Sequence, residues 1–458
     1  MKKREIIEGV IKDYDFPNKG SFELDGKKVI VKGALPGQKV SCMVSKVRKD
    51  KAEARLLDVL ERSEIEDAVP PCPQFGICGG CAYQTMSYEH QLELKAGQVK
   101  KLLDGVIDSE AHPYDWEGII GSPVTTAYRN KMEYSFGDEY KDGPLVLGLH
   151  KKNSMYDIVP VCNCVIVSED YNRIVSYTME FARAHGLSYH KKMQHVGLLR
   201  HLVLRQSKTN GGLLVNLVTS TDGLENLDLN AYVEGLLALP LDGTIVGILH
   251  TANDSLADAV VPDKVTLLYG RDYIEEEVLG LHFQISPFSF FQTNTKSAER
   301  LYSKAREYAG DTKDKLIFDL YSGTGTIAQM LAPVAKKVVG VEIVEEAVEA
   351  AKVNAELNGL DNCEFIAGDV LKVVDELEDK PDFIVLDPPR DGIHPKAIQK
   401  IINFNVDQMV YISCKPTSLV RDLEVFEAAG YKVMRASAID QFPSSVHIES
   451  IVLLQKVR

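Results

Sequence analysis

Five apolar strand segments, separated by helical segments, follow one another in the C-terminal third of the chain. The strand segments are KLIFDLYSG (315–323), KKVVGVE (336–342), CEFIAGD (363–369), DFIVLDPP (382–389) and QMVYISC (408–414). The segment VEEAVEAAKVNAELNG (344–359) is helical in period, with Ala347, Val348, Ala351 and Ala355 on one face and Gly359 as its end. Strands that alternate with helices predict a doubly wound, mostly parallel α/β sheet.

Residues suited to ligand binding follow three of these strands. Gly323-x-Gly325-x-x-Ala328 opens a helix, Glu342 ends the second strand segment and Asp387 follows the fourth. The carboxyl ends of parallel strands meet at one edge of the sheet, where ligands bind. Dinucleotide and S-adenosylmethionine sites share this geometry, but the Asp-Pro-Pro sequence favours a class I (Rossmann-like) methyltransferase. Turn glycines and a solvated strand-end charge are the plainer alternatives.

Cys414 comes directly after the fifth strand segment, at the same predicted edge. A cysteine there can act as a nucleophile, whereas a buried cysteine elsewhere is usually inert. A free thiol is mostly protonated at neutral pH, so we expect activation by backbone amides or by Lys415. His447 and Glu449 are two candidates for a general base, since alternation along a strand would place them on one face. An exposed edge-strand pair is the alternative.

The first 62 residues differ from the rest in charge and pattern. They carry a net charge of +5, which leaves −19 for the remainder of a chain whose total is −14. Short alternating segments with turns at Asp25-Gly26 and Pro36-Gly37 predict an OB-like β-barrel over 1–62. A basic module on an acidic body is expected to contact phosphates, although a chance basic N-terminus would look similar.

Three cysteines, Cys72, Cys78 and Cys81, lie in a Gly/Pro-rich segment, and VCNC offers Cys162 or Cys164 as a fourth ligand. Thiolate ligation suits zinc or an iron–sulfur cluster, and three clustered cysteines with one remote favour [4Fe–4S]. A site without metal is the third possibility. Cys42 and Cys363 are read as ordinary small apolar residues.

Between the cysteine segment and the α/β pattern, strands predominate. HLVLRQSKTNGGLLVNLVTS predicts a hairpin with its turn at Asn210-Gly211-Gly212, and DYNRIVSYTMEFARAHG predicts a helix closed by Gly186. Arg129 and Lys131 are candidate RNA contacts. Four aromatic residues near the predicted edge are candidates for base stacking, or more simply core residues: Phe288, Phe290, Phe291 and Tyr321.

Several ordered motifs resemble those of the RNA (uracil-5-)methyltransferase family, and the likeness spans nearly the whole chain. They are YRNKM (128–132), SPFSFFQTN (286–294), FDLYSGTGT (318–326), LDPPRDG (386–392), YISCKP (411–416), RDL (421–423) and DQFPSSVHIES (440–450). The 1–62 module is similar to the TRAM domain of that family. Lys415, where the family usually has Asn, and Ser444-Ser445-Val446, where it usually has Gln-Thr-x, depart from the pattern on the substrate side.

The resemblance implies a specific chemistry. Cys414 is expected to add to C6 of a flipped uracil so that C5 can accept a methyl group from S-adenosylmethionine, and Glu449 to remove the C5 proton. Asp387 is expected close to the uracil and, with four further residues, at the methyl donor: Gln292, Tyr321, Gly323 and Glu342. Arg129, Phe288 and His447 are expected at the RNA substrate.

The resemblance also selects an iron–sulfur subclass with Cys72, Cys78, Cys81 and Cys164 as ligands. It makes 23S ribosomal RNA the expected substrate and transfer RNA the alternative. The expected parts are the barrel (1–62), a cluster-bearing mixed α+β middle domain (63–87 and 106–275) and the methyltransferase domain (88–105 and 276–458).

Two other classes of function stay open on sequence alone. An amino-group methyltransferase using DPPR would not need Cys414, and a non-catalytic iron–sulfur RNA-binding protein would bind no methyl donor. No apolar run reaches ~18 residues, and the segment MKKREIIEGV lacks the apolar stretch expected of a signal peptide. A cytoplasmic, membrane-free and monomeric enzyme is therefore expected.

Overall fold

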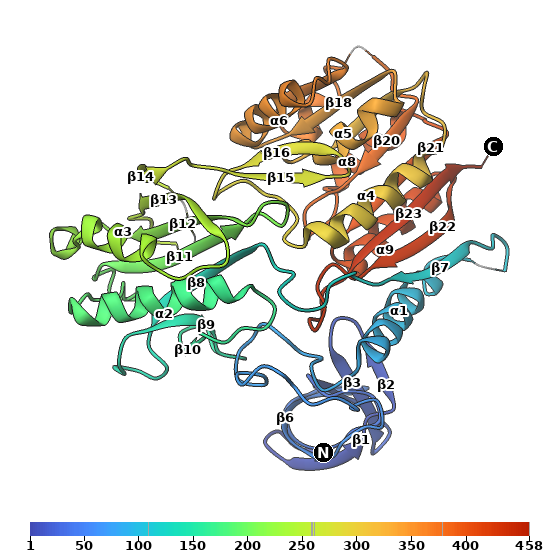
Figure 1. Ribbon diagram of the computed structural model, residues 1–458. Helices are drawn as coiled ribbons and strands as arrows, with labels where there is room; N and C mark the ends of the chain where they lie inside the picture. The colour runs from blue at the N-terminus through green and yellow to red at the C-terminus, as the bar shows by residue number, and fades with distance from the viewer. Residues whose placement is uncertain (109, 258–259, 261, 378, 458) are drawn as a thin grey trace.

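The computed structural model describes residues 1–108, 110–257, 260, 262–377 and 379–457. These residues form three β-sheet regions with flanking helices, and a two-stranded ribbon links two of them (Figure 1). Within the described ranges, no helix is both long and apolar enough to cross a membrane.

The N-terminal region is a six-stranded sheet in the order β1-β5-β6-β4-β3-β2, which curls into a ring in Figure 1. The strands are β1 (Ile6–Val10), β2 (Asp13–Asp15), β3 (Lys19–Leu24), β4 (Lys27–Lys32), β5 (Lys39–Val47) and β6 (Lys51–Glu61). Asp25 and Gly26 both have positive φ, as the tight hairpin between β3 and β4 requires.

Next, α1 (Tyr88–Asp104) leads away from the ring toward the C-terminal sheet (Figure 1). The middle region is a seven-stranded sheet in the order β10-β9-β8-β11-β12-β13-β14. Its strands are β8 (Lys131–Gly137), β9 (Val146–His150), β10 (Ile158–Pro160), β11 (Leu199–Gln206), β12 (Gly212–Thr219), β13 (Thr244–Ala252) and β14 (Lys264–Gly270). The expected hairpin is β11–β12, and the helix expected before Gly186 is α2 (Glu169–Ala184); α3 (Leu229–Leu237) packs beside α2.

The ribbon of β15 (Ile274–Val278) and β16 (Leu281–Ile285) leads into α4 (Thr295–Ala309) and an eight-stranded sheet. Its order is β19-β18-β17-β20-β21-β23-β22-β7. The first five are the predicted parallel strands: β17 (Leu316–Leu320), β18 (Lys337–Glu342), β19 (Cys363–Ala367), β20 (Phe383–Leu386) and β21 (Gln408–Ser413). They are separated by α5 (Thr326–Leu331), α6 (Glu345–Leu357), α7 (Val370–Val373) and α8 (Pro395–Asn403), and α9 (Pro416–Ala428) follows.

The sheet is extended beyond β21 by β23 (Glu449–Lys456), which runs antiparallel to β21, and by β22 (Tyr431–Ile439). Its last strand is β7 (Asp115–Ile120), which pairs in parallel with β22. This pairing crosses the boundary expected at residue 106, because β7 lies within the range assigned to the middle domain. The sequence of β7, DWEGII, is short and holds a glycine, so it gives little indication of its partner.

Two buried clusters cover the two faces of the eight-stranded sheet, including Phe318, Leu386 and Tyr411 in one and Ile317, Val385 and Val410 in the other. These residues alternate along the parallel strands, as expected where helices cover both faces. The face of α6 is confirmed at Val348, Ala351 and Ala355, and Asn354 is buried beside them.

Candidate active site

The loop after β17 is shaped by residues with left-handed backbone conformations. Tyr321, Gly323 and Gly325 have φ values of 69°, 53° and 71°. A Cβ at Gly325 would lie 2.4 Å from the Phe365 ring and 2.9 Å from the Ala351 Cβ, so α5 can begin here only at a glycine. This requirement explains the second glycine of the motif without reference to any ligand.

Glu342 holds this loop in place. One of its carboxylate oxygens accepts a hydrogen bond from the Gly323 amide and the other from the Val344 amide, both at 2.9 Å. The carboxylate therefore fixes the turn, and each oxygen keeps a further lone pair for a ligand hydroxyl.

Asp319, at the end of β17, is a carboxyl group that sequence reasoning missed. It is fully buried, and one oxygen accepts from the Ala328 amide at 2.9 Å. Its other oxygen has no hydrogen-bond partner among the described residues, and the same holds for the Ser322 hydroxyl. Burial, with the nearby Asp387 carboxyl, raises the pKa of Asp319 to about 8. Its place inside an apolar strand is the signal that points to it.

Asp387 follows β20 at the same sheet edge. The residue as a whole keeps some solvent exposure, but its carboxyl lies deep among protein atoms, and this burial raises the pKa of Asp387 to about 7.

Cys414 and Glu449 come from neighbouring antiparallel strands. The β21–β23 register pairs Ser413 with Ser450, so the next residue after β21 lies beside the first residue of β23. Cys414 is partly exposed and Glu449 is 3% exposed. Burial and the carboxyls of Glu449 and Asp387 raise the pKa of Cys414 to about 12, and burial with Asp387 also raises the pKa of Glu449 well above its usual value.

Arg390 is a cation at this site that was not predicted from the sequence. Its guanidinium lowers the pKa of both Cys414 and Glu449, against the larger effect of burial. Its Nη2 donates to Nδ1 of His447 at 3.0 Å, so this ring nitrogen is an acceptor. Of the two expected activators, a backbone amide at Cys414 itself also lowers the pKa of the thiol, as the smallest of these effects. The Lys415 side chain instead has its Nζ 3.5 Å from the Asp391 carboxylate.

His447 lies just before β23 and not within it, so the expected strand alternation with Glu449 is not present. Burial, together with the cationic Arg390, lowers the pKa of His447 to about 4, which keeps the ring neutral at physiological pH. Only a neutral imidazole has an unprotonated nitrogen that can accept the hydrogen bond from Arg390.

Helix α9 fixes the loop that carries Arg390. The Asp422 carboxylate accepts from the Tyr411 hydroxyl at 2.7 Å and from the Ile393 amide at 2.8 Å. Ser418 donates to the Arg390 carbonyl at 2.8 Å. The RDL motif therefore holds the LDPPRDG loop against the sheet.

The motif SPFSFFQTN is held between the middle and C-terminal regions. The Asn130 side chain donates to the Gln292 carbonyl at 3.0 Å, and the Gln292 side chain accepts from Gln441 at 3.3 Å. Phe291 is buried against Phe283, so it is a core residue. Phe288 is half-buried and Phe290 is 68% exposed, which leaves both available to a ligand.

Arg129 and Tyr321 lie at the borders of the site. The Arg129 side chain donates to the Lys131 carbonyl at 2.9 Å, and its charge contributes to lowering the pKa of His447. Tyr321 is partly buried, and burial raises the pKa of its phenol above the usual value.

The four expected cluster ligands are neighbours. The thiols of Cys164, Cys78 and Cys72 each contribute to raising the pKa of Cys81, after the larger effect of burial. All eight cysteines are free. In the described ranges, however, no three His, Cys, Asp or Glu side chains are close enough to hold a metal ion as they stand. The Cys162 sulfur accepts a hydrogen bond from its neighbour Asn163.

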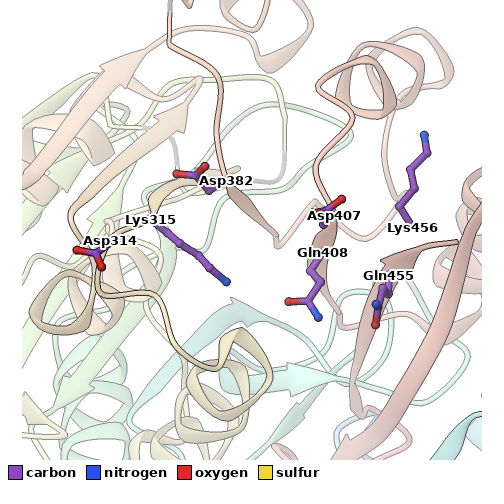
Figure 2. Close-up of a pocket in the computed structure, with 7 residues that line it drawn as sticks. All are labelled: Asp314, Lys315, Asp382, Asp407, Gln408, Gln455 and Lys456. Carbon is purple, nitrogen blue, oxygen red and sulfur yellow. The ribbon is translucent and has the colours of Figure 1, made fainter. Parts of the chain in front are cut away.

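A surface pocket lies at the opposite edge of the same sheet. Figure 2 shows it at the amino ends of β17, β20 and β21, lined by Asp314, Lys315, Asp382, Asp407, Gln408, Gln455 and Lys456. Functional groups of parallel sheets gather at the carboxyl ends, so this pocket is on the wrong edge for the chemistry.

The comparisons with known proteins agree with this geometry. A sequence model of the family described as tRNA (Uracil-5-)-methyltransferase matches residues 261–457. An uncharacterised RNA methyltransferase of Clostridium acetobutylicum is 49% identical over 457 residues, covering 100% of this chain and 99% of the relative. Another, of Caldanaerobacter subterraneus subsp. tengcongensis, is 48% identical over 458 residues, covering 100% of both.

Among solved structures, the chain is similar to the Pyrococcus abyssi tRNA (uracil-54, C5)-methyltransferase in complex with S-adenosyl-L-homocysteine. The TM-score is 0.75 at 26% identity, and the match covers 98% of this chain and 100% of the other. The C-terminal sheet thus has the class I methyltransferase fold. The chain belongs to the tRNA (uracil-5-)-methyltransferase family of S-adenosylmethionine-dependent RNA methyltransferases.

Proposed function

We propose that this protein methylates C5 of a uridine in RNA through a covalent bond between Cys414 and C6 of the base. The observation that carries the proposal is the placement of Cys414 beside Glu449, on adjacent strand ends and next to Asp387 at the carboxyl edge of the sheet. An amino-group methyltransferase would need neither the thiol nor a base beside it.

The residues divide the reaction into two steps. The partly exposed Cys414 thiol gives its proton to solvent and its sulfur adds to C6, which leaves C5 electron-rich enough to accept the methyl group. Glu449 then takes the C5 proton, the C5–H electron pair re-forms the C5–C6 double bond, and the C6–S bond breaks to release the thiolate. S-adenosylmethionine supplies the electrophilic methyl group when bound.

The residues at the loop after β17 fit a methyl donor. We assign Gln292, Tyr321, Gly323, Glu342 and Asp387 to it, as the motifs predict. The unpartnered buried oxygens of Asp319 and Ser322 in this part of the chain are suited to a polar ligand, and the carboxyl groups are suited to its sulfonium charge. Backbone amides and glycines at a strand-to-helix turn allow close approach.

For the RNA, Arg129, Phe288 and His447 are assigned to the flipped uridine and its neighbours. The 1–62 region, with exposed Lys46, Arg48, Lys49 and Lys51, is assigned as a TRAM-type module that contacts phosphates farther away. The three-part organisation proposed from sequence is retained, with β7 added to the methyltransferase part because of its pairing with β22.

Cys72, Cys78, Cys81 and Cys164 are assigned as ligands of a [4Fe–4S] cluster. Their neighbouring thiols come from two separate loops and offer the ligand set such a cluster takes. The uracil reaction has no redox step, so these residues would serve to hold the middle region together.

The proposed substrate is 23S ribosomal RNA, because the four-cysteine pattern resembles the ribosomal RNA enzymes of the family. Transfer RNA is the second candidate, favoured by the likeness to the P. abyssi enzyme, which is a tRNA (uracil-54, C5)-methyltransferase. Both are tested by the same experiment.

The experiment uses 5-fluorouridine-substituted RNA, in which fluorine replaces the proton that the base must remove. The protein, S-adenosylmethionine and either ribosomal or transfer RNA should give a covalent complex that survives denaturing electrophoresis. Cys414→Ala should give none. The RNA that forms the complex identifies the substrate class.

Lack of a complex with the wild-type protein, under conditions where the RNA binds, would overturn the covalent mechanism. Full methylation activity in Cys414→Ala would favour amino-group chemistry. Failure to bind S-adenosylmethionine in calorimetry would favour a non-catalytic RNA-binding protein.

A further inference from the structure

The segment before Glu449 is held by the N-terminal half of the chain. Ser444 has a φ of 65°, an unusual conformation for a residue other than glycine. Its carbonyl accepts hydrogen bonds from the amides of Ala82 and Tyr83, at 2.8 and 3.0 Å. Its own amide donates to the Gln91 side chain at 2.8 Å. Both backbone groups of Ser444 are thus used by residues more than 350 positions earlier.

The residues before Ser444 are held in the same way. The Pro443 carbonyl accepts from the buried Tyr128 hydroxyl at 3.0 Å, and the Phe442 carbonyl accepts from Lys95 at 3.0 Å. Lys95 also pairs with Asp440 at 2.7 Å, where both side chains are fully buried. We call residues 440–444 the clamped segment.

The partners of the clamped segment adjoin the cysteines. Ala82 and Tyr83 directly follow Cys81, and Val446 packs against the apolar cluster that contains Tyr83. On the other side, Ser445 turns back to the Phe442 carbonyl and its hydroxyl accepts from the His447 amide at 3.2 Å. We call residues 72–81, which carry three cysteines, the cysteine loop. A continuous series of hydrogen bonds therefore links the residues directly after the cysteine loop to His447, two residues before Glu449.

We propose that the chain immediately after Cys81, together with Gln91 and Tyr128, is a positioning device for the base at Glu449. This inference rests on the proposed function, and it assigns the cysteine loop a role in the release step. We call the hydrogen bonds that hold the clamped segment the clamp. When the clamp is weakened, the Glu449 carboxylate is no longer positioned to take the C5 proton. Cys414, which is held by β21, still adds to C6.

The two steps respond differently to such a change. Methyl transfer needs the C6–S bond and the donor, so it proceeds. Release needs Glu449 to take the C5 proton so that the C6–S bond can break. A weakened clamp should therefore leave a methylated base still joined to Cys414 on ordinary, unfluorinated RNA.

The test uses the full-length protein with single-turnover kinetics on uridine-containing substrate RNA. Tyr128→Phe and Gln91→Leu each remove one bond of the clamp, and their combination should slow release by about tenfold while methyl transfer stays within about twofold. Gln91→Glu keeps an acceptor for the Ser444 amide and should restore release. Tyr134→Phe is the matched control, since this buried hydroxyl has no partner among the described residues.

A second measurement, amide hydrogen exchange, reports on the clamped segment independently of enzymatic activity. In Cys81→Ala, hydrogen exchange of the amides in 440–449 should be faster than in the wild type, while exchange in β17 is unchanged. Wild-type exchange in 440–449 together with wild-type release in the double variant would overturn the inference. A missing adduct on 5-fluorouridine RNA with the wild-type protein would instead overturn the proposed function itself.

Discussion

Asp387 and Asp319 are acidic groups whose neutral forms the fold favours, with pKa values raised to about 7 and about 8. A carboxyl with a raised pKa stabilises the fold fully below its unfolded pKa near 3.8, and this stabilisation is lost as pH rises through the folded value. Above these pKa values the two carboxyls are ionised, and they then attract the positive sulfonium of the ligand. Binding of a cationic ligand therefore offsets the stability that the fold loses at higher pH.

We therefore expect the affinity for S-adenosylmethionine to rise by about tenfold between pH 6 and pH 8.5, which is the effect of one pKa unit or ~1.4 kcal/mol. S-adenosylhomocysteine, which lacks the sulfonium charge, should show a smaller rise. Calorimetric titration of both ligands across this range checks the prediction, with Asp319→Asn expected to flatten the profile. Equal pH dependence for the two ligands would contradict it.

Arg390 opposes the rise of the Cys414 pKa to about 12. Arg390→Ala removes a cation that favours the thiolate, so the pKa of Cys414 should rise further. The rate of adduct formation near pH 7.5 should then fall by about tenfold, and its pH profile should move to higher pH. Arg390→Lys should recover part of the rate.

The control for Arg390 is Lys415→Ala, because the Lys415 ammonium faces Asp391 at 3.5 Å. Its adduct rate should stay near that of the wild type. If the pH profile shifts in Lys415→Ala and not in Arg390→Ala, the activating cation is Lys415, as the sequence suggested.

The five parallel strands and their place at the site were predictable from the sequence. Their apolar runs are continuous because helices cover both faces, and the residues that end them are glycines, carboxylates and a cysteine. The sequence did not reveal Arg390 or Asp319, because a role for either depends on packing between segments far apart in the chain. The His447–Glu449 alternation failed because β23 begins only at Glu449.

Helix α1 shows a second kind of feature that local patterns miss. Its lysines look alike in sequence, but Lys95 is fully buried against Asp440 whereas Lys100 pairs with Asp104 on the surface. A buried ion is costly to leave without its partner, and an exposed pair contributes little.

Lys95→Met should therefore destabilise the protein by about 3–5 kcal/mol, since it leaves the Asp440 carboxylate buried without its cation. Lys100→Met on the same helix should change stability by ~0.5 kcal/mol or less. Urea unfolding followed by circular dichroism measures both. Equal midpoints for the two variants would show that the buried pair is not needed for stability.

The strands of the methyltransferase sheet are not contiguous in the sequence. Its edge strand β7 comes from before the middle region, and α1 packs on β7 and α9. The matched family segment, 261–457, lacks both elements. A domain boundary drawn from sequence alone would separate strands that are hydrogen-bonded.

We expect a fragment of residues 261–458 to be poorly soluble, because it exposes the edge of β22 and the buried Asp440. Co-expression with residues 83–125, which contain α1 and β7, should recover soluble, S-adenosylmethionine-binding material. Gel filtration and calorimetry measure the recovery. A monomeric, ligand-binding fragment without this segment would show that β7 is dispensable.

The parallel pairing of β7 with β22 also sets an order for folding on the ribosome. Asp115 pairs with Arg435, so the early strand must wait for 320 residues to be synthesised, about 16–64 s at 5–20 residues per second. During that interval β7 has no strand partner, and Lys95 has no Asp440 carboxylate to pair with. Chaperone demand should therefore depend on how fast the message is translated between these two strands.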